Sequence, residues 1–70
     1  MTKVYVVVWE PYHDNGSLYG VFSSIESAER SEPGVEFSRH GWYVDNREGC
    51  VSQGCTDSDC YLIYEREVKS

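Results

Sequence analysis

Basic side chains are scarce in this chain, which has six Lys and Arg residues against twelve Asp and Glu residues, a formal net charge of −6. Proteins that bind nucleic acid neutralise its phosphates with clustered Lys and Arg side chains. Because the chain has no such cluster, its composition argues against direct binding to nucleic acid. An acidic surface instead keeps a small protein soluble, steers it toward a basic protein, or occupies a groove that normally holds nucleic acid.

Long apolar runs are missing as well. A helix that spans a bilayer needs about 20 consecutive apolar residues, and no run in this sequence approaches that length. Met1 to Lys3 lead directly into a strand-like segment, without the apolar core of a signal peptide. We therefore expect a cytoplasmic protein that makes no contact with a membrane.

Motifs for catalysis are also lacking, since the sequence has neither a G-x-S-x-G elbow nor a glycine-rich phosphate loop. His13 beside Asp14 is a conceivable acid–base pair. However, His13 and His40 both fall in predicted turns, where polar residues are expected without a function. The sequence predicts a protein that is not an enzyme and needs no cofactor.

The cysteines do not have the spacing of a common metal site. Cys50, Cys55 and Cys60 are each separated by four residues, so no C-x-x-C pair occurs. Together with His40 they would supply the four ligands of tetrahedral zinc, and a small zinc-stabilised domain is the alternative function. An odd number of cysteines in one polar loop does not resemble a secreted disulfide framework. We expect no bound metal, and the sequence leaves open whether this loop forms a disulfide.

Strand-like segments make up most of what is present. Lys3–Trp9 is β-branched or aromatic on both alternating faces, which is typical of a central strand. Pro11 should end this strand, and Asp14-Asn15-Gly16 suits a hairpin turn. Leu18–Phe22 returns as the second strand. Tyr61–Val68 closes the chain as a strand whose charged second half suits a sheet edge.

One short helix is expected after the second strand. Ser23 and Glu26 have the S-x-x-E spacing of a capping box, so the helix should begin at Ser23 or Ser24. Pro33 disfavours helical backbone at the preceding residue, and Gly34 can supply a left-handed exit. Because a helix of about two turns is marginal in water, it should exist only if it packs on the sheet.

The middle of the chain holds two more strand-like segments, Val35–Ser38 and Trp42–Asp45, which form either one strand or two. Arg47–Asp59 is polar, contains glycine and lacks periodicity, which predicts a loop. This order of elements predicts an α+β fold, with a small antiparallel sheet of three to five strands and one short helix packed on one face. Its length of 70 residues predicts a single domain, residues 1–70.

Aromatic residues make up 14% of the chain, more than so small a core can readily bury. Tyr and Trp are also the residue types that often carry binding energy at interfaces. These rings therefore either fill the core and cover the face without the helix, or form an exposed patch with an acidic rim. The predicted partner-binding residues are Trp9, Glu10, Tyr12, Glu36, Trp42, Tyr43, Asp45, Tyr64, Glu65 and Glu67.

Four parts of the chain carry a resemblance to known proteins. They are the strand Lys3–Trp9, the Asp-Asn-Gly hairpin, the passage Gly20–Ser24 into a helix, and the closing strand Tyr61–Val68. Together they resemble an uncharacterised family of small bacterial and phage α+β domains. The passage G-V-F-S-S-x-E-x-A is the most specific element, and the cysteine-containing loop departs from the pattern. The resemblance implies a small accessory protein of phage or mobile-element type, with no catalytic residues to carry over.

The leading hypothesis about function rests on the small size, the acidic charge, the many aromatic residues and this resemblance. The chain is expected to be a non-enzymatic module that binds and regulates a larger protein with a basic surface. An inhibitor of a host defence nuclease, such as an anti-CRISPR protein, is one concrete form. Acidic side chains would occupy a basic channel of that partner, while Tyr and Trp would supply a desolvated anchor.

Overall fold

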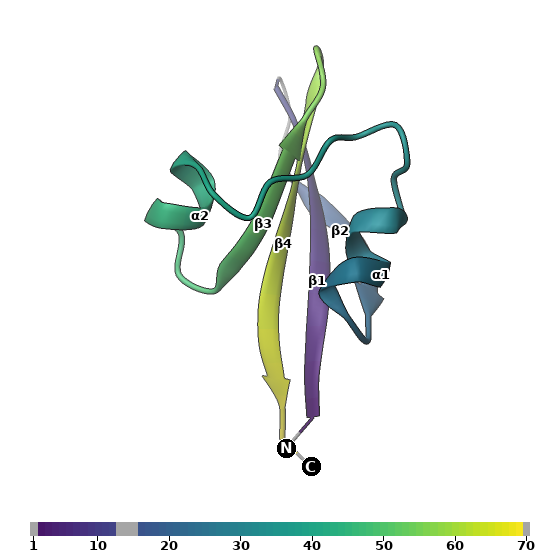
Figure 1. Ribbon diagram of the computed structural model, residues 1–70, viewed down its shortest axis with the longest axis vertical. Helices are drawn as coiled ribbons and strands as arrows, with labels where there is room; N and C mark the ends of the chain where they lie inside the picture. The colour runs from purple at the N-terminus through teal and green to yellow at the C-terminus, as the bar shows by residue number, and fades with distance from the viewer. Residues whose placement is uncertain (1, 13–15, 70) are drawn as a thin grey trace.

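The computed structural model describes residues 2–12 and 16–69. These residues form one antiparallel sheet of four strands in the order β2-β1-β4-β3, with two short helices (Figure 1). The elements in chain order are β1 (Thr2–Pro11), β2 (Ser17–Phe22), α1 (Ile25–Arg30), α2 (Trp42–Asn46), β3 (Cys50–Cys55) and β4 (Asp59–Val68). The α+β class is confirmed and the strand count falls in the expected range, but a second helix is present.

Strand β1 lies in the interior of the sheet, as its apolar residues on both faces predict. It pairs with β2 on one side and with β4 on the other. Val7 at its centre stands opposite Gly20 and Ile63 and is fully buried. The strand ends at Pro11, which has no N–H group to extend the ladder. Residues 14 and 15 of the predicted hairpin turn lie outside the described residues.

One face of the sheet carries the buried core. Side chains alternate along a strand, so Val7 and Trp9 share a face of β1. Ile63 and Tyr61 stand opposite them on β4 and point to the same side. Ala28 of α1 belongs to the same buried cluster. We name this side the core face.

The opposite side of the sheet is less evenly covered. Figure 1 shows α1 and α2 on opposite sides of the sheet, with α2 beside β3, and we name the second side the α2 face. Leu62 is fully buried on it. On β2, in contrast, Leu18 and Val21 are 66% and 55% exposed. The part of the α2 face that β2 forms is therefore open to solvent.

Helix α1 begins one residue after Ser24, which is its N-cap. The backbone of Ser24 is extended, and its side-chain oxygen accepts a hydrogen bond from the Ser27 N–H at 3.1 Å. The predicted capping box with Ser23 is therefore wrong, although the predicted start was within one residue. At the other end, Ser31 donates from its backbone N–H to the Ala28 carbonyl. Gly34 does not have a positive φ angle, so the predicted left-handed exit is also wrong.

We expect Ser24→Ala to lower the free energy of unfolding by about 1 kcal/mol, because the helix start loses its side-chain acceptor. Ser23→Ala is the matched control, since Ser23 is exposed and lies one residue outside the cap. Its effect should stay within about 0.5 kcal/mol. Urea unfolding of both variants measures the difference, and a larger loss for Ser23→Ala would contradict this assignment of the cap.

Helix α2 replaces a predicted strand, so the expectation of a strand over Trp42–Asp45 is wrong. The side-chain oxygen of Gln53 on β3 accepts hydrogen bonds from the backbone N–H groups of Tyr43 and Val44, at 2.8 and 3.3 Å. N–H groups in the first turn of a helix have no partner within the helix. Gly41 precedes the helix with a φ of 124°, where a side chain would be strained. A hydrogen bond from a distant strand thus outweighs the local β propensity.

The predicted loop over Arg47–Asp59 is also wrong for six of its thirteen residues, because Cys50–Cys55 forms strand β3. This strand pairs with β4 from Cys50 to Cys55, with a register shift between Cys50 and Ser52. Strand β4 is therefore interior over its first half. Its charged second half, after Tyr64, pairs with β1 alone, so only that part lies at an edge.

The predicted strand over Val35–Ser38 is reduced to a single bridge between Ser38 and Gln53 on β3. The backbone groups of these two residues exchange hydrogen bonds of 2.7 and 2.9 Å. The chain between the helices therefore crosses the sheet as an irregular segment that is fixed at one point on β3. In the described part of the chain, no helix is both long enough and apolar enough to cross a membrane.

Candidate functional site

Helix α2 presents two adjoining aromatic rings beside the sheet. Trp42 is 65% exposed, and its ring meets the ring of Tyr43 edge to face, with 5.1 Å between ring centroids. The Gln53 side chain fixes the start of the helix by accepting the hydrogen bonds described above. Aromatic pairs in this geometry are favourable beyond the area that they bury. A large aromatic side chain is thus held in place while most of it remains in solvent.

Arg47, directly after α2, connects these rings to the sheet. Its guanidinium group lies over the Tyr43 ring, 4.9 Å from the centroid. One guanidinium nitrogen donates to a carboxylate oxygen of Glu10 at 2.5 Å and to the Tyr64 hydroxyl at 3.3 Å. The group formed by Glu10, Trp42, Tyr43, Arg47 and Tyr64 is named the Arg47 cluster.

The contacts of the Arg47 cluster orient its central cation. The hydrogen bond with Tyr64, followed by that with Glu10, raises the pKa of Arg47 above its ordinary value. The ion pair between Arg47 and Glu10 is about one-third exposed on each side, so its contribution to stability is small. The main consequence of the ion pair is geometric, because it helps to hold the guanidinium group of Arg47 over the Tyr43 ring.

Some of the predicted partner-binding residues come together in this cluster. They are Glu10, Trp42, Tyr43 and Tyr64, contributed by β1, α2 and β4. Asp45 is exposed on the same helix as Trp42. These positions form a continuous group only because Arg47 links the helix to the sheet.

The other predicted residues lie elsewhere. Trp9 is half-buried and packs against the core cluster. Tyr12 is exposed and donates its hydroxyl hydrogen to the Thr56 carbonyl at 2.9 Å. Glu36 is exposed in the segment between the helices. The structure does not bring these residues into the Arg47 cluster.

The two glutamates of β4 also differ from each other. Glu65 is half-buried, accepts a hydrogen bond from the Tyr5 hydroxyl at 3.1 Å and pairs with Lys3 at 3.3 Å. Glu67 is exposed. The carboxylate of Glu65 is therefore already engaged within the chain, whereas that of Glu67 faces solvent.

The sequence did not point to Arg47 and Arg66, which the structure places over aromatic rings. Arg47 lies four residues after Tyr43, a spacing that places two side chains on the same side of a helix, but this signal exists only if the segment is read as helical. Arg66 places its guanidinium over the Tyr64 ring at 5.0 Å. It lies two residues after Tyr64 on a strand, a spacing that puts both side chains on the same face of the sheet.

The cysteines form a cross-strand link. Cys55 and Cys60 stand directly opposite each other on β3 and β4 and are joined by a disulfide. Cys50 is a buried free thiol, and its burial raises its pKa. Sulfur atoms joined in a disulfide are not thiolate ligands. Among the described residues, no group of three or more His, Cys, Asp or Glu side chains is placed to hold a metal ion.

Reduction of the disulfide is expected to lower the free energy of unfolding by about 2 kcal/mol, because the link closes only a short loop. The reduced protein should still fold, since β3 and β4 remain paired through their backbones. Urea unfolding with and without a phosphine reductant measures the change. A Cys55→Ser, Cys60→Ser double variant is the control and should not respond to the reductant. Loss of the folded spectrum on reduction would show that the disulfide is required for folding.

Comparison with models of protein families, with curated proteins and with solved structures finds no match to this chain.

Proposed function

We propose that this chain is a small, non-enzymatic protein-binding module that docks on a larger protein through the Arg47 cluster. The observation that carries the proposal is Trp42, which is 65% exposed yet held against Tyr43, whose ring in turn is covered by Arg47. Trp, Tyr and Arg are the residue types that dominate binding energy at protein interfaces. Side chains held in place before binding lose less conformational entropy when the partner arrives.

The partner that we propose has a basic surface. The formal charge of −6 speeds encounter with such a protein. The Trp42 anchor, once the partner buries it, chiefly slows dissociation. Of the two glutamates on β4, Glu67 is the better candidate for this steering, because Glu65 is engaged with Tyr5 and Lys3. An inhibitor of a host defence nuclease, encoded by a phage or mobile element, is the form that the family resemblance favours.

In the scaffold that we propose, α1 packs on the core face, and the part of the α2 face that carries the Arg47 cluster is left for the partner. Ala28, which is fully buried in the core cluster, supports this arrangement. The location that we propose is the cytoplasm, where thiols are kept reduced. Cys55 and Cys60 are then expected as thiols in the working protein. A reduced protein that does not fold would therefore exclude this location.

Trp42→Ala should weaken partner binding by about 2 kcal/mol or more, because it removes the exposed anchor. Val68→Ala is the matched control, since Val68 is 45% exposed but lies at the end of β4, four residues beyond Tyr64. Immobilised wild-type protein and both variants are incubated with bacterial host lysate, and the retained proteins are quantified by mass spectrometry.

The expected result is a protein that the wild type and Val68→Ala retain equally and Trp42→Ala loses. Thermal melts of both variants should match the wild type, because neither side chain is buried. A partner retained equally by all three proteins would show that the docking surface is not the Arg47 cluster.

A further inference from the structure

A concave surface lies away from the Arg47 cluster, between α1 and the segment that follows it. It is an open groove of about 630 Å³ lined by Glu26, Glu29, Arg30, Pro33, Val35, Glu36 and Phe37. Figure 1 shows this segment leaving α1 and crossing in front of the sheet toward α2. We name this concavity the α1 groove.

The apolar wall of the α1 groove is fixed to the sheet. Val35 and Phe37 are half-buried and pack against the core cluster. Gly54 of β3 lies so close that a Cβ atom there would come within 2.5 Å of a Val35 methyl group. The bridge between Ser38 and Gln53 holds the chain just beyond Phe37. The groove is therefore a formed feature of the surface, with apolar side chains at its base.

One carboxylate of the groove has a role within the chain. Glu29 accepts hydrogen bonds from Arg39 at 3.1 and 3.4 Å and from the Ser52 hydroxyl at 2.8 Å. Burial alone would raise the pKa of Glu29, but the hydrogen bonds from Arg39 and Ser52 outweigh it and lower that pKa. Glu29 thus ties α1 to β3 and is not available to a partner.

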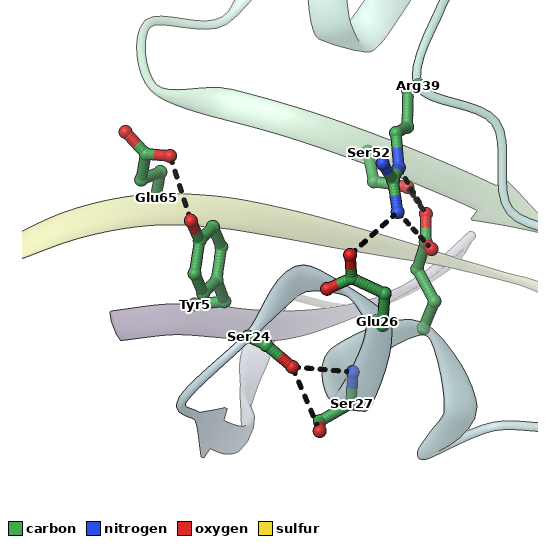
Figure 2. Close-up of polar contacts among 8 residues, drawn as sticks. Tyr5, Ser24, Glu26, Ser27, Arg39, Ser52 and Glu65 are labelled. Carbon is green, nitrogen blue, oxygen red and sulfur yellow. Dashed lines mark hydrogen bonds and ion pairs between the residues drawn. The ribbon is translucent and has the colours of Figure 1, made fainter. Parts of the chain in front are cut away.

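The other two carboxylates remain available. The Glu26 side chain is 58% exposed and reaches Arg39 only at 3.9 Å (Figure 2). Glu36 is exposed and forms no ion pair with any described residue. Arg30 is the cation among the lining residues. With Glu29 neutralised by Arg39, the rim retains an excess of negative charge beside the apolar base.

We propose that the α1 groove binds an extended basic segment of a protein, in which lysine or arginine residues flank an apolar side chain. The apolar side chain would cover Val35 and Phe37, and the cations would meet Glu26 and Glu36. Charge complementarity selects this occupant, because a second copy of this acidic chain would bring further negative charge to the rim. The inference stands apart from the proposed function, which uses the other face of the sheet.

The test uses short acetylated peptides as probes and follows the amide resonances of ¹⁵N-labelled protein by NMR. One peptide alternates lysine with leucine, a second alternates lysine with serine, and a third alternates glutamate with leucine. The lysine–leucine peptide should shift the resonances of residues 26–37 in a saturable way. Both other peptides should bind at least about tenfold more weakly, since each lacks one of the two complementary features.

Variants locate the binding. Glu26→Gln combined with Glu36→Gln should weaken the lysine–leucine peptide about tenfold, as expected for the loss of two exposed ion pairs. Glu48→Gln combined with Glu67→Gln changes the net charge equally at exposed positions outside the groove and should have little effect. Equal weakening by both pairs, equal binding of the lysine–serine peptide, or resonance shifts that leave residues 26–37 unaffected would each overturn the inference.

Trp42→Ala separates this inference from the proposed function. The variant should bind the lysine–leucine peptide as the wild type does, because Trp42 is not a lining residue of the α1 groove. Loss of peptide binding in Trp42→Ala would place the peptide on the Arg47 cluster and overturn the inference. Loss of the host partner with peptide binding retained is the result that both proposals together predict.

Discussion

Ile63→Ala should lower the free energy of unfolding by about 2–5 kcal/mol, because it removes buried methyl groups and leaves a cavity. Ile63 is fully buried, and its neighbours across the sheet are Val7 on β1 and Ser52 on β3. Small domains have total stabilities of about 5–15 kcal/mol, so the loss is a large fraction of the whole. Urea unfolding followed by far-ultraviolet circular dichroism gives the change.

Leu18→Ala is the control for this measurement. Leu18 is 66% exposed on the edge strand β2, so its replacement should change the free energy of unfolding by no more than about 0.5 kcal/mol. Losses of similar size in the two variants would contradict the assignment of the core to the face that carries Val7 and Ile63.

Ala28→Pro should cost about 3 kcal/mol or more, since proline removes a helical hydrogen bond and clashes with the preceding turn. The bond in question runs from the Ala28 N–H to the Ser24 carbonyl at 3.1 Å. Ala28 is also fully buried in the core cluster. Thermal unfolding measures the loss.

Ala28→Gly provides the comparison for the proline variant. It keeps the N–H group and should cost about 1 kcal/mol from helix propensity alone, with a further loss from the missing methyl group. A melting temperature that is unchanged in Ala28→Pro would show that Ile25–Arg30 is not a helix.

The sequence predicted those elements whose signal is local. Lys3–Trp9 has apolar side chains on both faces, and the structure places it as the interior strand β1. The start of α1 was placed within one residue because serine is a strong N-cap residue. The exact cap was missed, since two serines are adjacent and the choice depends on which one has extended backbone.

Elements that depend on distant contacts could not be predicted. Trp42-Tyr43-Val44 has the composition of a strand, yet Gln53 on β3 supplies the acceptor that starts a helix there. Strand β3 contains Cys, Ser, Gln and Gly without alternation, and it forms by pairing with β4. The pairing that makes the first half of β4 interior was therefore missed as well, whereas its charged second half pairs with β1 alone and lies at an edge, as expected.

In the candidate site, likewise, most of the residues could be predicted from the sequence but their assembly could not. Composition indicated residue types that are typical of interfaces, and Glu10, Trp42, Tyr43 and Tyr64 were among the predicted positions. Their assembly rests on Arg47, whose partner Glu10 is 37 residues away in the sequence. No local pattern shows that pairing, because it depends on β1 and β4 lying side by side while α2 folds against β3.

Site-specific photo-crosslinking in host cells tests the proposed docking surface most directly. A benzophenone amino acid is placed at the position of Asp45, which is exposed on α2 beside the Arg47 cluster, or at that of Val68, which is 45% exposed at the end of β4. One discrete crosslinked protein is expected from position 45, absent from position 68 and lost when Trp42→Ala is added. No adduct at position 45, or the same adducts from both positions, would contradict docking through the Arg47 cluster.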